Sequence, residues 1–186
     1  MLFYESIESH PSDWSALIFK DQTITFGDLR KTIDTGAAYL QAKGVQKGDR
    51  VGLFSKNCPE FVTAYHAIVK AGAIVVPINF MLSPTETSFI LKDAGSKLLM
   101  TQETLDLEAA LEKREYSGVA QLTFAEMAEA PEAVPAPVKM HEDECCTIIY
   151  TSGTTGNPKG AMLSHKNILA NIHSFTNAIS MEPKDK

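Results

Sequence analysis

The sequence predicts an α/β fold, in which a layered, mostly parallel sheet carries helices on both faces. Strand and helix patterns alternate from about residue 50 to residue 180, which is typical of parallel strands joined by crossover helices. The segment AIVVPIN (73–79) is apolar without alternation, as expected of a strand that is covered on both faces. Several helical segments also begin with capping residues and end at a glycine.

The first elements have clear local signals. SALIFKDQTITF (15–26) predicts two short strands around a polar turn. Thr25 can cap the helix that follows, and Asp28 occupies the position of a capping-box acid. This helix ends at Gly44, and DRVGLFS (49–55) is the next strand.

The central helices are predicted from the residues that start and stop them. One helix begins at Pro59 and ends at Gly72, and its apolar residues cover most of its circumference, which indicates a buried helix. After the apolar strand, Ser83 and Glu86 form a capping box, and that helix runs to Gly95.

The C-terminal half continues the alternation with shorter elements. They are a strand KLLMT (97–101), a helix 103–114, a strand GVAQLTF (118–124), a short helix capped by Thr123 and Glu126, a strand CCTIIYT (145–151) and a helix capped by Ser164. Between them, APEAVPAPV (130–138) places three prolines in seven residues and predicts a semi-rigid linker.

Composition narrows the function classes. Apolar residues make up 44% and charged residues 22%, as in globular proteins, and a net charge of −6 without a basic patch argues against nucleic acid as a partner. No apolar run approaches the ~20 residues of a membrane span, and the N-terminus lacks a signal-peptide pattern. Cys58, Cys145 and Cys146 predict buried thiols in a reducing, cytoplasmic location, and Cys145 and Cys146 should face opposite sides of the sheet. No metal site is predicted.

The segment TSGTTGNPKG (151–160) directly follows a predicted strand and has the composition of a phosphate-binding loop. Its glycines allow the backbone to approach a ligand closely, and its hydroxyl groups and lysine suit phosphate oxygens. It is not a Walker A loop, because Pro158 precedes the lysine and Gly160 replaces the residue that would place a hydroxyl on magnesium. It also lacks the G-x-G-x-x-G spacing of dinucleotide-binding loops.

The longer segment YTSGTTGNPKGAMLSH (150–165) closely resembles the phosphate-binding signature of the AMP-forming adenylate-forming enzymes. These include acyl-CoA synthetases, luciferases and the adenylation domains of peptide synthetases. The Gly-Asp-Arg-Val segment (48–51) and the Ala-Gly-Ala-x-x-Val-Pro-x-Asn segment (71–79) resemble the start of that family's large domain. The resemblance covers the chain from about residue 5.

The resemblance implies a two-step reaction that uses ATP, Mg²⁺ and coenzyme A. A carboxylic acid, for which family frequency suggests a fatty acid, forms an acyl-adenylate, and a thiol then displaces AMP. The loop is expected to grip the β- and γ-phosphates of ATP through Thr151, Ser152, Gly153, Thr154, Thr155, Gly156 and Lys159. No catalytic residue and no metal ligand is assigned.

The chain departs from the family by what it does not contain. The family's Tyr-Gly-x-Thr-Glu segment, its ribose-binding aspartate, its hinge arginine and its C-terminal lysine are absent from the 186 residues. We therefore expect residues 1–186 to be the N-terminal portion of a longer enzyme, and the chain alone to form no acyl-adenylate. Core-facing surface left uncovered would favour self-association.

Two other functions stay open: an adenylation domain that loads a carrier-protein thiol, and a non-catalytic nucleotide-binding remnant. A carrier domain downstream would identify the first, and a natural reading frame ending at Lys186 would favour the second. Among single residues, we expect Asn79 to form a turn, His66 to pack in the core and His165 to be solvated in the first turn of the last helix. The acidic run 142–144 is expected to solvate the start of its strand.

Overall fold

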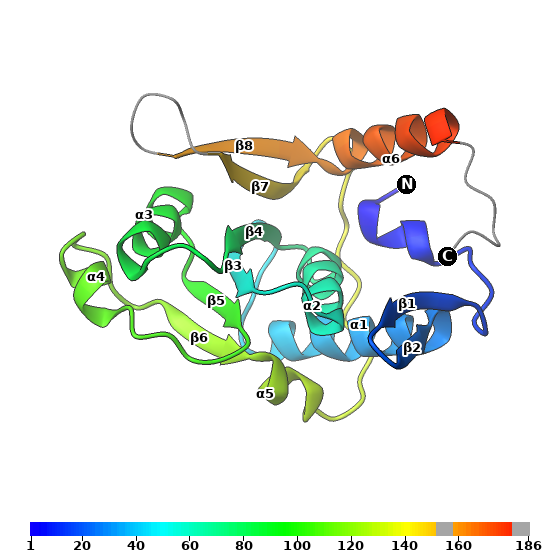
Figure 1. Ribbon diagram of the computed structural model, residues 1–186, viewed down its shortest axis with the longest axis horizontal. Helices are drawn as coiled ribbons and strands as arrows, with labels where there is room; N and C mark the ends of the chain where they lie inside the picture. Colours follow the sequence, from blue (N-terminus) through cyan, green and yellow to red (C-terminus); the bar gives the residue numbers. More distant parts are fainter. Residues whose placement is uncertain (152–157, 180–186) are drawn as a thin grey trace.

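A six-stranded sheet forms the centre of the protein, in a computed structural model that describes residues 1–151 and 158–179 (Figure 1). Its strands, in spatial order, are β6 (Ala120–Thr123), β5 (Leu98–Thr101), β3 (Arg50–Ser55), β4 (Ile74–Asn79), β7 (Cys145–Thr151) and β8 (Lys159–Ser164). All neighbours pair in parallel except β7 and β8, which are antiparallel. The predicted mostly parallel α/β fold is confirmed.

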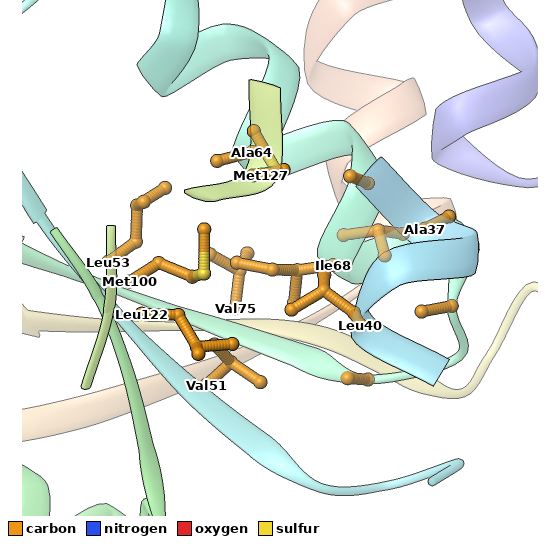
Figure 2. Close-up of a cluster of buried hydrophobic side chains, with 14 of the residues drawn as sticks. Ala37, Leu40, Val51, Leu53, Ala64, Ile68, Val75, Met100, Leu122 and Met127 are labelled. Carbon is orange, nitrogen blue, oxygen red and sulfur yellow. The ribbon is translucent and has the colours of Figure 1, made fainter. Parts of the chain in front are cut away.

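Helices cover both faces of the sheet, as the apolar strands predict. On one face lie α1 (Phe26–Ala42), α2 (Pro59–Lys70) and α5 (Phe124–Ala128), and on the other lie α3 (Pro84–Ala94) and α4 (Glu108–Glu112). Figure 2 shows the first core, in which α1 and α2 pack Leu40 and Ile68 against side chains such as Val51 and Val75 of the sheet. Val76, next to Val75, belongs to the second core.

The predicted caps explain where the helices begin. Thr25 Oγ1 accepts a hydrogen bond from the Asp28 amide at 3.1 Å, at the start of α1. Ser83 and Glu86 close a complete capping box on α3, where the Glu86 carboxylate accepts the Ser83 amide at 2.9 Å. Gly95 ends α3 at φ +69°, and a Cβ there would lie 2.7 Å from the Arg50 guanidinium, so this position requires glycine on two grounds.

Among the described residues, four further elements and one irregular stretch lie outside the sheet and the helices named so far. The N-terminal strands β1 (Ser15–Phe19) and β2 (Gln22–Thr25) form a separate antiparallel pair, as predicted. The short 3₁₀ helix η1 (Phe3–Ile7) contacts α2 and α6 (His165–Ile179). The stretch 131–141 has neither helix nor strand, and the Gln41 side chain holds it through two hydrogen bonds to the backbone of Ala136.

Two elements differ from the prediction. The helix expected over 103–114 is limited to α4, because the segment before it is irregular and Leu105 is instead held by the Gln121 side chain. The segment after the loop was expected to lead directly into the last helix, yet it forms strand β8. Its sequence, KGAMLS, has no apolar alternation, so only its pairing with β7 makes it a strand.

The cysteines fit the prediction in part, because Cys146 is buried whereas Cys58 and Cys145 are only partly buried. All three are free thiols, Cys146 packs in the core below α1 and α2, and Cys145 packs in the core below α3. Their opposite directions confirm the expectation for neighbours in a strand. Burial raises the pKa of the Cys146 thiol to about 12, so it stays protonated.

Candidate functional site

The candidate site lies where β7 ends, at the mouth of the β7–β8 hairpin. In the antiparallel register, Thr151 stands directly opposite Lys159 and Tyr150 stands opposite Gly160. The hairpin therefore brings together the first and the last residue of the predicted phosphate loop, both of which are exposed. The other predicted residues, Ser152, Gly153, Thr154, Thr155 and Gly156, lie outside the residues that the structure describes.

Glycine is required at position 160 by the packing of the hairpin itself. A Cβ on Gly160 would lie 2.8 Å from Cγ2 of Ile148 and 3.0 Å from Cζ of Tyr150. The Tyr150 ring therefore lies against the backbone of β8 next to Lys159. A hydroxyl, an ammonium group and closely packed backbone at one hairpin mouth form a donor set that suits phosphate oxygens.

The carboxyl ends of the neighbouring parallel strands meet at the same edge of the sheet, which is where such folds bind ligands. A cavity of about 280 Å³ at this edge is lined by residues that include Ser55, Lys56, Phe80 and Thr101. Lys56 Nζ lies 5.7 Å from the centre of the Phe80 ring. Asn79 Oδ1 accepts the Met81 amide at 3.0 Å, so Asn79 forms the expected turn.

A larger cavity, of about 500 Å³, lies elsewhere, between α1, α2 and α5. Met127 and Pro59 contribute apolar lining, and the Lys31–Glu132 ion pair at 2.6 Å lies at its surface. None of the predicted site residues that the structure describes lines this cavity.

His165 differs from the sequence expectation: its side chain is only 1% exposed, so the prediction of a solvated residue is wrong. Its Nδ1 accepts a hydrogen bond from the Phe3 amide at 3.1 Å, a contact between residues at opposite ends of the chain. Burial lowers the pKa of His165, although Glu144 and Glu5 act in the opposite direction. No local signal in the sequence indicates a partner so distant.

His66 is buried, as predicted, and its ring stacks on Phe3 with 4.7 Å between the ring centres. Burial lowers the pKa of His66 to about 4, so the imidazole is neutral at neutral pH. Both histidines therefore hold η1 against the domain in their neutral forms.

Within the acidic run 142–144, which precedes β7, Glu144 has a structural role. Glu144 pairs with Lys47 at 2.6 Å, and this contact lowers the pKa of the Glu144 carboxyl. Within residues 1–151 and 158–179, no group of three His, Cys, Asp or Glu side chains could hold a metal ion. No helix in those ranges is long and apolar enough to cross a membrane.

Comparison with known proteins decides the family. The family model described as "AMP-binding enzyme" matches residues 3–186, which is nearly the whole chain. The chain belongs to the AMP-binding enzyme family. The β7–β8 hairpin lies within the matched residues.

Two curated relatives share about one third of their residues with the chain over the matched part. The chain is 38% identical to the 2-succinylbenzoate–CoA ligase of Bacillus subtilis, over 82% of this chain and 30% of that protein. It is 33% identical to tyrocidine synthase 1 of Brevibacillus parabrevis, over 100% of this chain and 17% of that protein. The matched part of the chain thus spans less than a third of the length of each of these two relatives.

A solved structure in the family has the same fold. The o-succinylbenzoate–CoA synthetase of Bacillus subtilis, in complex with AMP, matches with a TM-score of 0.85 and 29% identity, over 97% of this chain and 46% of that one. Other structures of that enzyme contain the acyl-adenylate OSB-AMP or the product analogue OSB-NCoA. The chain therefore belongs to the AMP-binding family and has the fold of the N-terminal part of such relatives.

Proposed function

We propose that residues 1–186 form the N-terminal portion of an AMP-forming carboxylic acid–CoA ligase, with fatty acids as the acid class and the 130–138 stretch as an internal linker. The observation that carries the proposal is the hairpin pair at the end of β7. There Thr151 and Lys159 are paired residues of the two strands, in a chain that belongs to the AMP-binding family.

The proposed reaction has two steps. A carboxylate oxygen of the acid attacks the α-phosphorus of ATP, an oxygen–phosphorus bond forms, the bond to the bridging β-phosphate oxygen breaks, and pyrophosphate leaves. The thiol sulfur of coenzyme A then attacks the acyl carbon, the acyl–oxygen bond breaks, AMP leaves, and the thiol proton goes to solvent.

In this proposal the hairpin acts in the first step. Negative charge builds on the leaving pyrophosphate, and the Lys159 ammonium group and the Thr151 hydroxyl stabilise it, together with residues 152–156. Because the hairpin fixes their register, these donors need little reorganisation when the charge develops. Mg²⁺ enters as the counterion of ATP and neutralises phosphate charge, and we assign it no protein ligand.

The test uses the Lys159→Ala variant in the full-length protein that the proposal implies. We expect acid-dependent exchange of labelled pyrophosphate into ATP to fall by about a hundredfold, because the variant removes a charged donor from the developing charge. Thioester formation from a preformed acyl-adenylate should change much less. A panel of fatty, aromatic and amino acids in the same assay identifies the acid.

Lys166 supplies the matched control, because it is an exposed lysine seven positions along the chain whose side chain forms an exposed ion pair with Asp143. Lys166→Ala should leave both half-reactions unchanged. Equal slowing of both half-reactions by Lys159→Ala would contradict the assignment of the loop to pyrophosphate.

A carrier-protein thiol is the alternative acceptor, and the similarity to tyrocidine synthase 1 favours keeping it in the test. The two acceptors differ in the second half-reaction alone. Transfer from the acyl-adenylate to free coenzyme A supports the ligase, whereas transfer only to a phosphopantetheine-bearing carrier supports the alternative.

A further inference from the structure

The β7–β8 hairpin is joined to the rest of the sheet by a short backbone ladder. The register between β4 and β7 contains the single pair Val75–Thr147, so the backbone ladder to the sheet does not extend toward Thr151. Figure 1 shows the hairpin reaching past β4 above α3. The residues expected to bind phosphate therefore lie beyond the bridged pair of β4 and β7, on a part of β7 whose Ile148 and Tyr150 side chains pack in the core below α3.

One polar side chain, that of Tyr150, connects this part of β7 to α3. The Tyr150 hydroxyl donates a hydrogen bond of 2.6 Å to Oδ2 of Asp93, which lies near the end of α3. Within residues 148–151 and 159–163, it is the one side-chain hydrogen bond that the structure gives to another element. Burial and the neighbouring Asp93 carboxylate both raise the pKa of the Tyr150 phenol, so it remains a donor at neutral pH.

The same ring also holds the other strand of the hairpin. Tyr150 stands opposite Gly160, and the missing side chain of Gly160 leaves the space that the ring occupies. The Tyr150 side chain thus connects α3, β7 and β8 at one point. The next pair outward is Thr151 and Lys159.

We propose that Tyr150 and Asp93 are positioning residues, which anchor the hairpin to α3 and thereby fix Thr151 and Lys159 for the phosphates of ATP. This proposal rests on the proposed function of the loop. The anchor itself is a property of the fold, and it can be measured without any ligand.

The experiment compares Tyr150→Phe with Tyr116→Phe in the full-length protein that the proposed function implies. Tyr116 is a matched control, because its ring also packs in the core below α3 and its hydroxyl donates a 2.9 Å hydrogen bond, to the Ser96 carbonyl, away from the hairpin. Amide hydrogen exchange of β8 and the dissociation constant of MgATP, measured by calorimetry, are the two readouts.

We expect Tyr150→Phe to speed amide exchange in β8 and to weaken MgATP binding by about threefold to tenfold, since it removes one hydrogen bond to a charged group that water partly screens. Tyr116→Phe should change neither readout. Asp93→Asn keeps an acceptor oxygen and should restore most of the affinity that Asp93→Ala loses. The double variant Tyr150→Phe/Asp93→Ala should be no weaker than either single variant, because both remove the same contact.

Equal behaviour of Tyr150→Phe and Tyr116→Phe in both readouts would overturn the proposal, as would additive losses in the double variant. If β8 exchanges faster but MgATP binding is unchanged, the anchor exists and its positioning role is refuted. If the full-length wild type binds no MgATP, the phosphate-binding function of the loop fails instead, and the exchange comparison still decides whether the anchor exists.

Discussion

The core between α2 and the sheet differs sharply from the β8–α6 region that follows the candidate loop. In the first, large apolar side chains such as Ile68 and Leu53 are fully buried. In the second, Met162 on β8 is 67% exposed and Phe175 on α6 is 58% exposed. Apolar helix residues are therefore buried in the first region, whereas in the second many of them lie at the surface. The candidate site lies next to the second, exposed region.

The comparison can be tested by making the same change, isoleucine to alanine, at one position in each region. Ile68→Ala on α2 removes a fully buried side chain, and we expect the free energy of unfolding to fall by about 2–5 kcal/mol. Ile172→Ala on α6, where the side chain is 37% exposed, should cost less than about 1 kcal/mol. Urea unfolding of the two variants and the wild type measures both values.

Both substitutions shorten an isoleucine side chain in a helix, so residue type alone would rank them as equal. A cost for Ile172→Ala as large as that for Ile68→Ala would show that α6 is packed as tightly as α2. The difference drawn between the two regions would then be wrong.

The two regions meet at η1, and their contact should depend on pH. Because burial lowers the pKa values of His66 and His165, the unfolded chain binds protons at these positions before the folded chain does. Stability should be fully present above pH ~6.5 and fall as the pH is lowered toward the His66 pKa of about 4. For His66 alone, about 2 kcal/mol should be lost between pH 7 and pH 5.

Urea unfolding across this pH range measures the loss. His66→Phe keeps a ring against Phe3 without a titrating group, so its stability should decline less below pH 6.5. His173→Gln is the control, because His173 is exposed on α6 and its removal should leave the wild-type pH dependence unchanged. An unaltered pH profile in His66→Phe would exclude the buried imidazole as the cause.

Features of the fold that depend on residues close together in the sequence were predicted correctly. The capping boxes of Ser83 and Thr123 and the apolar strand 73–79 are local signals, and the structure confirms each of them. The loop composition likewise predicted a phosphate-binding role for Thr151 and Lys159, which remains a prediction.

Features that depend on distant pairing were missed. Strand β8 exists because it pairs with β7, and His165 is buried because Phe3 reaches it from the other end of the chain. The Tyr150–Asp93 contact joins residues 57 positions apart. No pattern in a single sequence marks such contacts, since each partner alone is an ordinary polar or aromatic residue.

The smallest expected effect on folding concerns the open apolar surface itself. Exposed apolar side chains favour association, so we expect the 186-residue chain to self-associate and the double variant Met162→Ser/Phe175→Ser to do so less. The free energy of unfolding should change by less than about 1 kcal/mol, because neither side chain packs in a core. Sedimentation velocity over a range of protein concentrations measures the association.

Ile18→Ser is the matched control, because Ile18 on β1 has the same 58% exposure as Phe175 but lies in the separate two-stranded sheet. If β8 and α6 form the associating surface, Ile18→Ser should sediment like the wild type while the double variant shifts toward the monomer. Equal effects of the two changes would mean that any exposed apolar residue promotes association. In that case the surface that follows the candidate loop would have no special role, and the contrast between the two regions would reduce to a difference in packing alone.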